Sequence, residues 1–136
     1  MNTTDVLVDS NILLDLLEED PYWFEWSSTQ LQKAADRCTL IINPIIYAEI
    51  SVGFHRIEEL EEALPLDYFQ RRPIPWEAAF LAGKCFIRYR KFGGTKRSPL
   101  PDFFIGAHAA ISGLTLLTRD AARYRTYFPS LKLITP

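Results

Sequence analysis

The chain of 136 residues is poor in the residues that build soft-metal and disulfide sites, with only two cysteines and two histidines. Cys38 and Cys85 form no Cys-x-x-Cys pair, so the sequence favours neither a disulfide framework nor a zinc site, and both are expected to be buried thiols. His55 and His108 stand in no metal-ligand or catalytic-triad spacing. For His108 the expected role is packing or an interface.

Long hydrophobic runs are also missing. No segment has the run of about eighteen uncharged apolar residues that spans a bilayer, and the N-terminus has no basic region followed by an apolar one. We therefore expect a cytoplasmic protein without a membrane partner. Repeats, low-complexity tracts and linkers are absent as well, and 48% of the residues are hydrophobic. This length and composition suit one domain, residues 1–136.

The net charge of −2 conceals an uneven distribution. Between Arg71 and Arg97 eight basic residues stand against the single acid Glu77, which gives this segment +7 and leaves −9 for the rest of the chain. A basic band on an acidic body indicates a surface that meets an anionic partner.

Short buried strands alternate with helices along the sequence. Strands are expected at residues 5–8, 39–42, 114–117 and 132–134, with a weaker candidate at 72–74. Helices are expected at about 12–17, 21–36, 44–54, 57–64, 76–92, 102–112 and 121–128. The aromatic residues Tyr22, Trp23, Phe24 and Trp26 are expected to be chiefly core, and the alternative is that part of the cluster forms a groove for a second copy or a partner helix. This alternation predicts an α/β fold, in which a short parallel sheet is flanked by helices on both faces.

Four carboxylates occupy special positions in this pattern. Asp9 follows the first strand and Asp120 follows the strand at 114–117, so both are expected at the edge of the sheet where ligands bind. Asp102 begins the helix that leads into the strand at 114–117. Glu49 projects from an otherwise apolar helix face, where an unpaired carboxylate is costly to bury.

Each position also has an ordinary explanation. Asp102 and Asp120 are typical of helix N-caps or first-turn acids, and Asp9 is suited to anchor a turn with Ser10 and Asn11. The convergence of all four on one edge is much less expected by chance.

If the four carboxylates do converge, their mutual repulsion has to be offset. Two like charges ~4 Å apart cost about 4 kcal/mol at an effective dielectric constant near 20. Protons or a cation must compensate, and hard oxygen ligands favour Mg²⁺ or Mn²⁺ over zinc. Such an ion polarises a phosphodiester and lowers the pKa of an attacking water. The chemistry that this predicts is phosphodiester hydrolysis.

Four segments carry a resemblance to a known family: VDSNILLD, YAEI, LPDFFIGAHA and LLTRDAARY. Together they resemble the acidic motifs of PIN-domain ribonucleases, and most of all the VapC toxins of bacterial and archaeal toxin–antitoxin pairs. The likeness covers nearly the whole chain in length, element order and motif spacing. Residues 57–92 carry no matching motif.

The resemblance implies a single PIN-like domain and a homodimeric, Mg²⁺- or Mn²⁺-dependent endoribonuclease. The substrate it implies is RNA, with tRNA as one candidate, and a VapB-like antitoxin is expected to block the site. Asp9 and Asp102 would be direct metal ligands, Glu49 would bind metal or orient its water, and Asp120 would complete or assist a second site. Supporting polar roles fall to Ser10, Asn11 and Thr118.

The basic band offers a surface for the RNA itself. Its cations, with Tyr89 and Phe92 between them, suit phosphate binding and the stacking of unpaired bases. Near the acids, Arg119 and Arg123 either contact substrate or pair with a carboxylate. The residues expected to bind RNA are Arg88, Arg90, Lys91, Lys96, Arg97 and Arg119; a solvated helix end with a mobile loop is the ordinary alternative for the band.

Two other functions compete with the nuclease. A phosphorelay receiver domain also gathers acids and Mg²⁺ at a sheet edge, but it needs an Asp pair near the first strand and a lysine after the last. Asp9 stands alone, and Lys132 precedes its strand residues. The second alternative is a non-catalytic PIN-like module that binds RNA or protein, which the retention of all four acids disfavours.

Overall fold

The computed structural model describes residues 5–136, and none of the helices in this range has the length and apolar character that a membrane span needs. Five short parallel strands form one sheet in the order β3-β2-β1-β4-β5. The predicted α/β fold with a short parallel sheet is confirmed. The strands are β1 (Val6–Val8), β2 (Leu40–Ile42), β3 (Gln70–Arg71), β4 (Thr115–Leu117) and β5 (Leu133–Ile134).

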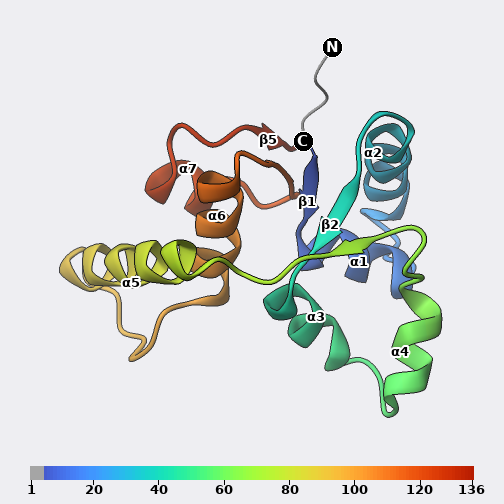
Figure 1. Ribbon diagram of the computed structural model, residues 1–136, viewed down its shortest axis with the longest axis horizontal. Helices are drawn as coiled ribbons and strands as arrows, with labels where there is room; N and C mark the ends of the chain where they lie inside the picture. The colour runs from blue at the N-terminus through green and yellow to red at the C-terminus, as the bar shows by residue number, and fades with distance from the viewer. Residues whose placement is uncertain (1–4) are drawn as a thin grey trace.

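Helices cover the sheet from both sides. In Figure 1, α1 and α2 lie on one side of β1 and β2, while α5, α6 and α7 lie on the other. The closest helix partners are α5 with α6 and α1 with α2, and α3 packs against both α1 and α6. The helices are α1 (Ser10–Leu17), α2 (Phe24–Arg37), α3 (Pro44–Ser51), α4 (Ile57–Ala63), α5 (Trp76–Lys91), α6 (Pro101–Ser112) and α7 (Ala122–Tyr127).

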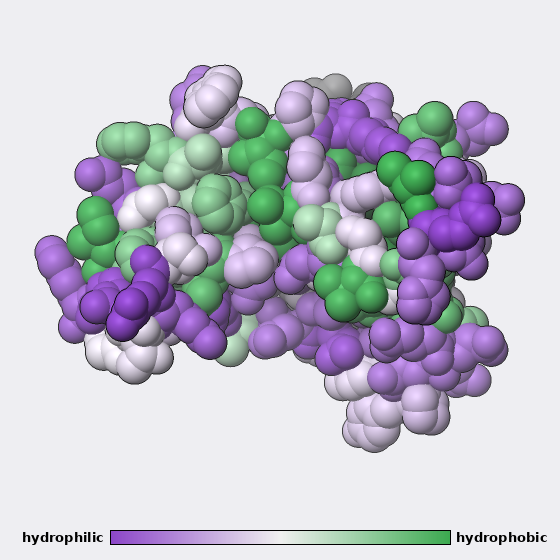
Figure 2. All heavy atoms as spheres, turned by 90° about the horizontal axis from the view of Figure 1, so that it is seen from below, coloured by the Kyte–Doolittle hydropathy of each residue, from purple (hydrophilic) through white to green (hydrophobic). Residues whose placement is uncertain are grey.

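The C-terminal end of α5 is strongly basic. Arg88, Arg90 and Lys91 occupy its last turn and are exposed to solvent. This end of the molecule is on the left in Figure 1 and in the view from below in Figure 2, where strongly hydrophilic side chains gather. The segment rich in positive charge therefore lies at one extremity of the domain.

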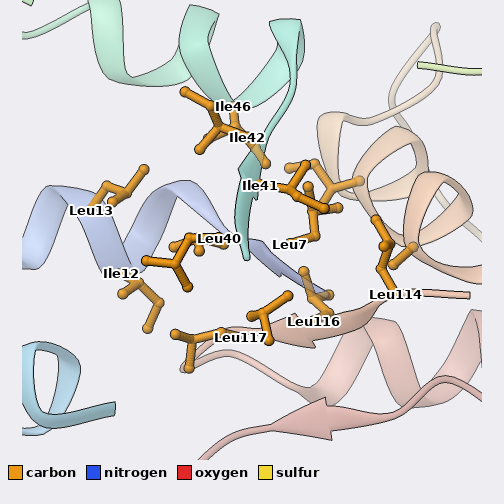
Figure 3. Close-up of a cluster of buried hydrophobic side chains, with 14 of the residues drawn as sticks. Leu7, Ile12, Leu13, Leu40, Ile41, Ile42, Ile46, Leu114, Leu116 and Leu117 are labelled. Carbon is orange, nitrogen blue, oxygen red and sulfur yellow. The ribbon is translucent and has the colours of Figure 1, made fainter. Parts of the chain in front are cut away.

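Buried aliphatic side chains of the central strands form the core. Figure 3 shows Leu40 and Leu117 pointing toward Ile12 of α1, whereas Leu7 and Ile41 point toward the opposite side. All four strand residues are buried. Because both faces of β1 and β2 are covered, these strands are continuous apolar runs without alternation.

Capping side chains start two of the helices at the carboxyl edge of the sheet. Asp9 is the N-cap of α1 and accepts a hydrogen bond from the backbone of Ser10 at 2.7 Å. Asn43 is the N-cap of α3 and accepts one from the backbone of Ile46 at 2.9 Å, with Pro44 as the first helical residue. Both caps satisfy helix donors, and they fix where the polar edge begins.

One strand lies elsewhere than predicted. We expected a weak strand at 72–74, but β3 comprises Gln70–Arg71 and pairs with β2 through Ile41 and Ile42. The backbone N–H of Arg72 still donates to Ile42 at 3.0 Å. Pro73 has no N–H to continue the ladder, so the strand ends before it.

The aromatic segment before α2 is also different from the prediction. Tyr22 is 81% exposed and Phe24 is exposed, so the expected core role is wrong for both residues. The backbone N–H groups of Tyr22 and Trp23 each donate to one carboxylate oxygen of Asp20 at 2.9 Å. These bonds hold a turn, and α2 consequently starts at Phe24 instead of Pro21.

The cysteines and His108 occupy structural positions. Cys85 is buried as predicted, whereas Cys38, just after α2, is only partly buried. His108 of α6 is buried, and its Nδ1 lies 3.0 Å from the amide nitrogen of Asn43 at the start of α3. Burial lowers the pKa of His108. The contact joins α3, which carries Glu49, to α6, which carries Asp102.

A buried carboxylate joins α1, α2 and the segment after β4. Asp15 accepts hydrogen bonds from the hydroxyl of Ser27 at 2.6 Å and from Nε of Arg119 at 2.8 Å. The guanidinium of Arg119 also lies 5.4 Å from the ring of Trp23. Because Asp15 is almost fully buried, its charge depends on these partners.

We predict that Asp15→Asn lowers the free energy of unfolding by about 2 kcal/mol, because it leaves the partly buried Arg119 without its counter-ion. Urea unfolding of the purified variant measures the change. Asp67→Asn, at an exposed aspartate, is the matched control and should change stability little. Equal stability of the two variants would contradict a structural role for the Asp15 pair.

Candidate active site

The polar edge of the sheet is where β1, β2 and β4 end. Asp9 follows β1, Asn43 follows β2 and Thr118 follows β4, and all three side chains are buried. β1 lies between β2 and β4 in the sheet, so Asp9 occupies the centre of this edge. In parallel α/β sheets this edge is the usual place for a ligand.

Asp9 is only 3% exposed, yet its carboxylate is well supplied with hydrogen bonds. Its Oδ1 accepts from the backbone of Ser10 at 2.7 Å. Its Oδ2 accepts from the hydroxyls of Thr118 and Tyr124, both at 2.9 Å. The donors come from α1, from the end of β4 and from α7, so three segments distant in sequence fix one carboxylate.

Tyr124 connects the first carboxylate to a second. Its hydroxyl donates to Asp9, and it also lies 3.4 Å from Oδ1 of Asp102, at the start of α6. A phenol has a single proton, so the shorter contact to Asp9 is the stronger bond. Tyr124 itself is 1% exposed and belongs to the core. The phenol thus bridges Asp9 and Asp102.

Glu49 is held from the other side. The hydroxyl of Ser10 donates to Oε1 of Glu49 at 2.7 Å and lies 3.4 Å from Oδ1 of Asp9. Glu49 is half-buried on α3, and its second oxygen has no hydrogen bond within residues 5–136. The costly unpaired carboxylate expected from the sequence therefore has one hydroxyl partner and one oxygen left over.

Crowding and burial raise the pKa values of the three acids. Burial, together with the nearby charges of Asp102 and Glu49, raises the pKa of Asp9 to about 6. Burial also raises the pKa of Asp102 and of Glu49, each above its ordinary range. The pKa of the Tyr124 hydroxyl rises because the residue is buried beside these acids, which keeps the phenol protonated. A cation placed here would relieve the repulsion.

The remaining polar residues stand at the rim. Asn11 donates to the hydroxyl of Thr118 at 3.2 Å, and the backbone N–H of Asp120 donates to the same oxygen at 3.2 Å. Thr118 accepts these two bonds, so its one proton is directed to Asp9. Asp120 is exposed, and within the described residues its carboxylate makes no hydrogen bond. Its charge nevertheless raises the pKa of Asp102.

The donor chemistry of this edge suits a hard divalent cation, because every free ligand atom is a carboxylate or hydroxyl oxygen. Within residues 5–136, however, no three acid, histidine or cysteine side chains are grouped closely enough to hold an ion as they lie. Asp9 is held fast, whereas Asp102 and Glu49 are only partly buried. Completing a metal site would therefore require these two side chains to turn toward Asp9.

The basic residues expected to bind RNA are placed in different ways. Arg119 is bonded to Asp15 and is thus occupied, although its backbone N–H donates to Asn11 at 3.3 Å. Arg90 donates to the carbonyl of Lys96 at 2.9 Å, which folds the loop back onto α5. The band members exposed to solvent are Arg88, Arg90, Lys91, Lys96 and Arg97.

Sequence reasoning missed Tyr124 as a member of the site. The residue lies four positions after Asp120 in the motif LLTRDAARY, where a helical tyrosine looks like an ordinary core residue. The available signal was that a short helix beginning just after Asp120 brings its third residue back over the same edge. A buried tyrosine needs a hydroxyl partner, and the nearest polar groups there are the acids.

The residues of this site lie within a segment that matches a known protein family. The model of the PIN domain family matches residues 6–129, which include Asp9, Glu49, Asp102, Asp120 and Tyr124. No curated protein matches the sequence of the chain.

Solved structures with the same fold come from toxin–antitoxin complexes. VapBC2 from Rickettsia felis, bound to promoter DNA, has a TM-score of 0.73 at 20% identity, with 96% of this chain and 98% of that chain covered. DNA-bound VapBC from Salmonella typhimurium has a TM-score of 0.71 at 16% identity, with 98% of each chain covered. A toxin–antitoxin complex from Klebsiella pneumoniae has a TM-score of 0.70 at 25% identity, covering 97% of this chain and 98% of that one. With the family match over most of its length, the chain belongs to the PIN-domain family.

Proposed function

We propose that this protein is a metal-dependent endoribonuclease that acts as the toxin of a type II toxin–antitoxin pair. The observation that carries the proposal is the set of three crowded carboxylates, Asp9, Glu49 and Asp102, at the carboxyl edge of the sheet, all with raised pKa values. Membership of the PIN-domain family and the likeness to VapBC complexes support it.

Asp9 and Asp102 would hold a Mg²⁺ or Mn²⁺ ion, Glu49 would bind the ion or orient its water, and Asp120 would assist from the rim. When bound, such an ion supplies Lewis-acid polarisation of the phosphodiester and a more acidic water. Their oxygens are the hard ligands that these ions prefer.

The surrounding side chains keep the acids in position. Thr118 and Tyr124 hold Oδ2 of Asp9, so the free lone pair of this carboxylate lies on Oδ1, the oxygen beside Ser10. Ser10 holds one oxygen of Glu49 and leaves the other to accept a proton or a hydrogen bond from water. Asp9 itself is only 3% exposed, so bulk solvent has little access to this carboxylate.

A second candidate is a PIN-like module that binds RNA or protein without cutting. The spacing of the acids favours it, since no three acid, histidine or cysteine side chains within residues 5–136 are grouped closely enough to hold an ion as they lie. The two functions are separated by incubating the purified protein with total cellular RNA, with Mg²⁺ or with chelator, and mapping new ends. New ends that appear only with Mg²⁺ support the nuclease.

A VapB-like antitoxin would dock on an apolar groove between α1 and α4. Leu17 and Tyr68 are exposed at this groove, and the neighbouring Glu18 and Glu19 are exposed as well. An amphipathic helix that presents apolar residues to the groove and basic residues to the glutamates would fit it. The groove is lined by Leu13, Leu16, Leu17, Leu31, Ala63, Leu64, Pro65, Asp67, Tyr68 and Phe69.

A second copy of the chain would cover an apolar stripe on α5. Trp76 is 89% exposed and Phe80 is 69% exposed, four residues apart on one face, and Ile87 continues the stripe. Gly83 has open space above it, which allows another helix to approach closely. A self-complementary helix pair about a two-fold axis would bury this stripe.

We predict that Asp9→Asn and Asp102→Asn each reduce Mg²⁺-dependent RNA cleavage at least about hundredfold, because each removes a ligand charge. Mapped RNA ends and the cleavage rate of one mapped site measure the effect. Asp67→Asn, remote from the site, is the control and should cleave normally. Full activity of Asp102→Asn at saturating Mg²⁺ would refute its role as a ligand.

Metal-free Asp9→Asn should be more stable than the natural sequence at about pH 7.5, by about 2 kcal/mol. Ionising Asp9 costs folding energy, because its pKa is raised to about 6 in the folded state. This cost is present above that pKa and vanishes as the pH falls toward the ordinary value. Urea unfolding at about pH 7.5 and at a pH near the ordinary pKa of an aspartate should thus show a gain in the free energy of unfolding of the variant only at the higher pH.

Mn²⁺ should raise the melting temperature of the natural protein, since only the folded site binds the ion. It should not raise that of Asp9→Asn, which lacks the charge of this ligand. A stability gain of Asp9→Asn that is equal at both pH values would contradict the crowded-acid interpretation.

We predict that Phe80→Glu converts a dimer into a monomer, because it places a charge in the centre of the α5 stripe. Light scattering after size-exclusion chromatography measures the mass. Ile57→Glu, at an exposed apolar residue of α4, is the control and should remain dimeric. Dissociation by both variants, or by neither, would place the interface elsewhere.

A further inference from the structure

Arg123 differs from the other arginines near the acid cluster. Four arginines form ion pairs within residues 5–136: Arg56, Arg71, Arg72 and Arg119. Arg123 is not among them, although it lies on α7, directly before Tyr124. Arg119, the arginine expected from the sequence to bind RNA at this edge, is engaged with Asp15.

Aromatic rings hold the side chain of Arg123 in place. Its guanidinium carbon lies 5.8 Å from the ring centre of Tyr89 and 5.9 Å from that of Phe103. These two rings are themselves in edge contact, with their centres 5.8 Å apart. A guanidinium over an aromatic face gains about 0.5–1 kcal/mol at an exposed site and more when desolvated.

A second arginine rests on the same aromatic cluster. Tyr127 packs against Phe103 with ring centres 4.9 Å apart, and the guanidinium carbon of Arg88 lies 5.3 Å from the Tyr127 ring. Arg88 is exposed at the basic end of α5. The aromatic cluster therefore carries two cations from different helices.

Packing against aromatic rings leaves the N–H groups of a guanidinium free to donate to oxygen atoms. These groups present donors in a planar fork, which matches the oxygens of a phosphate. Within the described residues, neither a carboxylate nor a carbonyl accepts a hydrogen bond from Arg123. Its donors are thus pre-positioned and uncommitted.

The position of Arg123 places these donors beside the acids. Phe103, which it contacts, directly follows Asp102, and Tyr124, its neighbour in the chain, bonds Asp9. The charge of Arg123 also stabilises the ionised form of Asp102, which lowers the pKa of that carboxyl against the effect of burial. RNA phosphates approaching a cluster of carboxylates need a nearby cation to offset repulsion.

We propose that Arg123 binds a backbone phosphate of single-stranded RNA next to the acid cluster, and that Arg88 binds a further phosphate of the same strand on the way to the basic end of α5. The proposal rests on the proposed ribonuclease function. This arrangement defines a path for the RNA strand across the protein surface, from the carboxylates over the Tyr89–Phe103–Tyr127 cluster to the basic band.

The test measures RNA binding separately from cleavage. Asp9→Asn protein, which should not cut, is titrated with a short fluorescein-labelled single-stranded RNA at several KCl concentrations in Mg²⁺. Adding Arg123→Gln should weaken binding about tenfold and reduce the slope of log affinity against log salt by about 0.7, the loss of one phosphate contact. The affinity with Arg123→Lys should fall between that of the Asp9→Asn reference and that with Arg123→Gln, because an ammonium keeps the charge but loses the planar fork of donors.

Arg125→Gln is the matched control, since this exposed arginine lies two residues further along α7 and, within residues 5–136, makes no aromatic contact of the kind described for Arg123. It should leave affinity and salt slope unchanged, and the melting temperature of each variant verifies its fold. Equal salt slopes for Arg123→Gln and Arg125→Gln would overturn the assignment of Arg123 while leaving the ribonuclease proposal intact. If the Asp9→Asn reference shows no salt-dependent binding of RNA, the proposed RNA substrate falls, and the role of Arg123 falls with it.

Discussion

The buried carboxylate of Asp9 is the constraint on which the rest of this structure depends. A charge with so little solvent exposure is tolerated only where hydrogen-bond donors surround it. Ser10, Thr118 and Tyr124 supply those donors from three separate segments. Strand order, helix caps and the C-terminal helix α7 can all be understood as the means by which these segments meet at one point.

The sheet order explains how residues more than a hundred positions apart become neighbours. β1 lies between β2 and β4, so the three central strands bring the chain to adjoining points of the same edge, at Asp9, Asn43 and Thr118. Each arrival is followed by polar side chains, and the helices that then begin carry Glu49 on α3 and Tyr124 on α7. Parallel strands connected by helices make such an edge inevitable, whereas the residues placed on it decide its chemistry.

Much of the fold follows from local patterns in the sequence. The runs around Leu7 and Ile41 are uninterrupted and apolar, and the run around Leu116 is broken only by Thr115, so strands in a covered parallel sheet were predictable to within a residue. The two-residue strand β3 was not, because it consists of the polar Gln70 and Arg71 and exists only through pairing with β2. The exposure of Tyr22 likewise depends on a turn held by Asp20, which composition does not reveal.

The candidate site was predictable in its acids and unpredictable in its partners. Carboxylates after buried strands are visible in sequence, which is why Asp9 could be singled out. The phenol of Tyr124 could not be, and for Arg123 the sequence left open whether it contacts substrate or pairs with a carboxylate, since both roles depend on how α7 packs against α6. The hydrogen bond from Arg119 to Asp15 likewise depends on the tertiary fold, because these residues are 104 positions apart.

The contact between Asn43 and His108 has a consequence for the packing of α3 against α6. The amide oxygen of Asn43 is already engaged by the backbone of Ile46, so its nitrogen must donate, and Nδ1 of His108 must accept. This requires the neutral imidazole tautomer with hydrogen on Nε2. At acidic pH, the protonated ring of His108 would present an N–H donor to the amide nitrogen of Asn43. The hydrogen bond between the helices that carry Glu49 and Asp102 would then be lost.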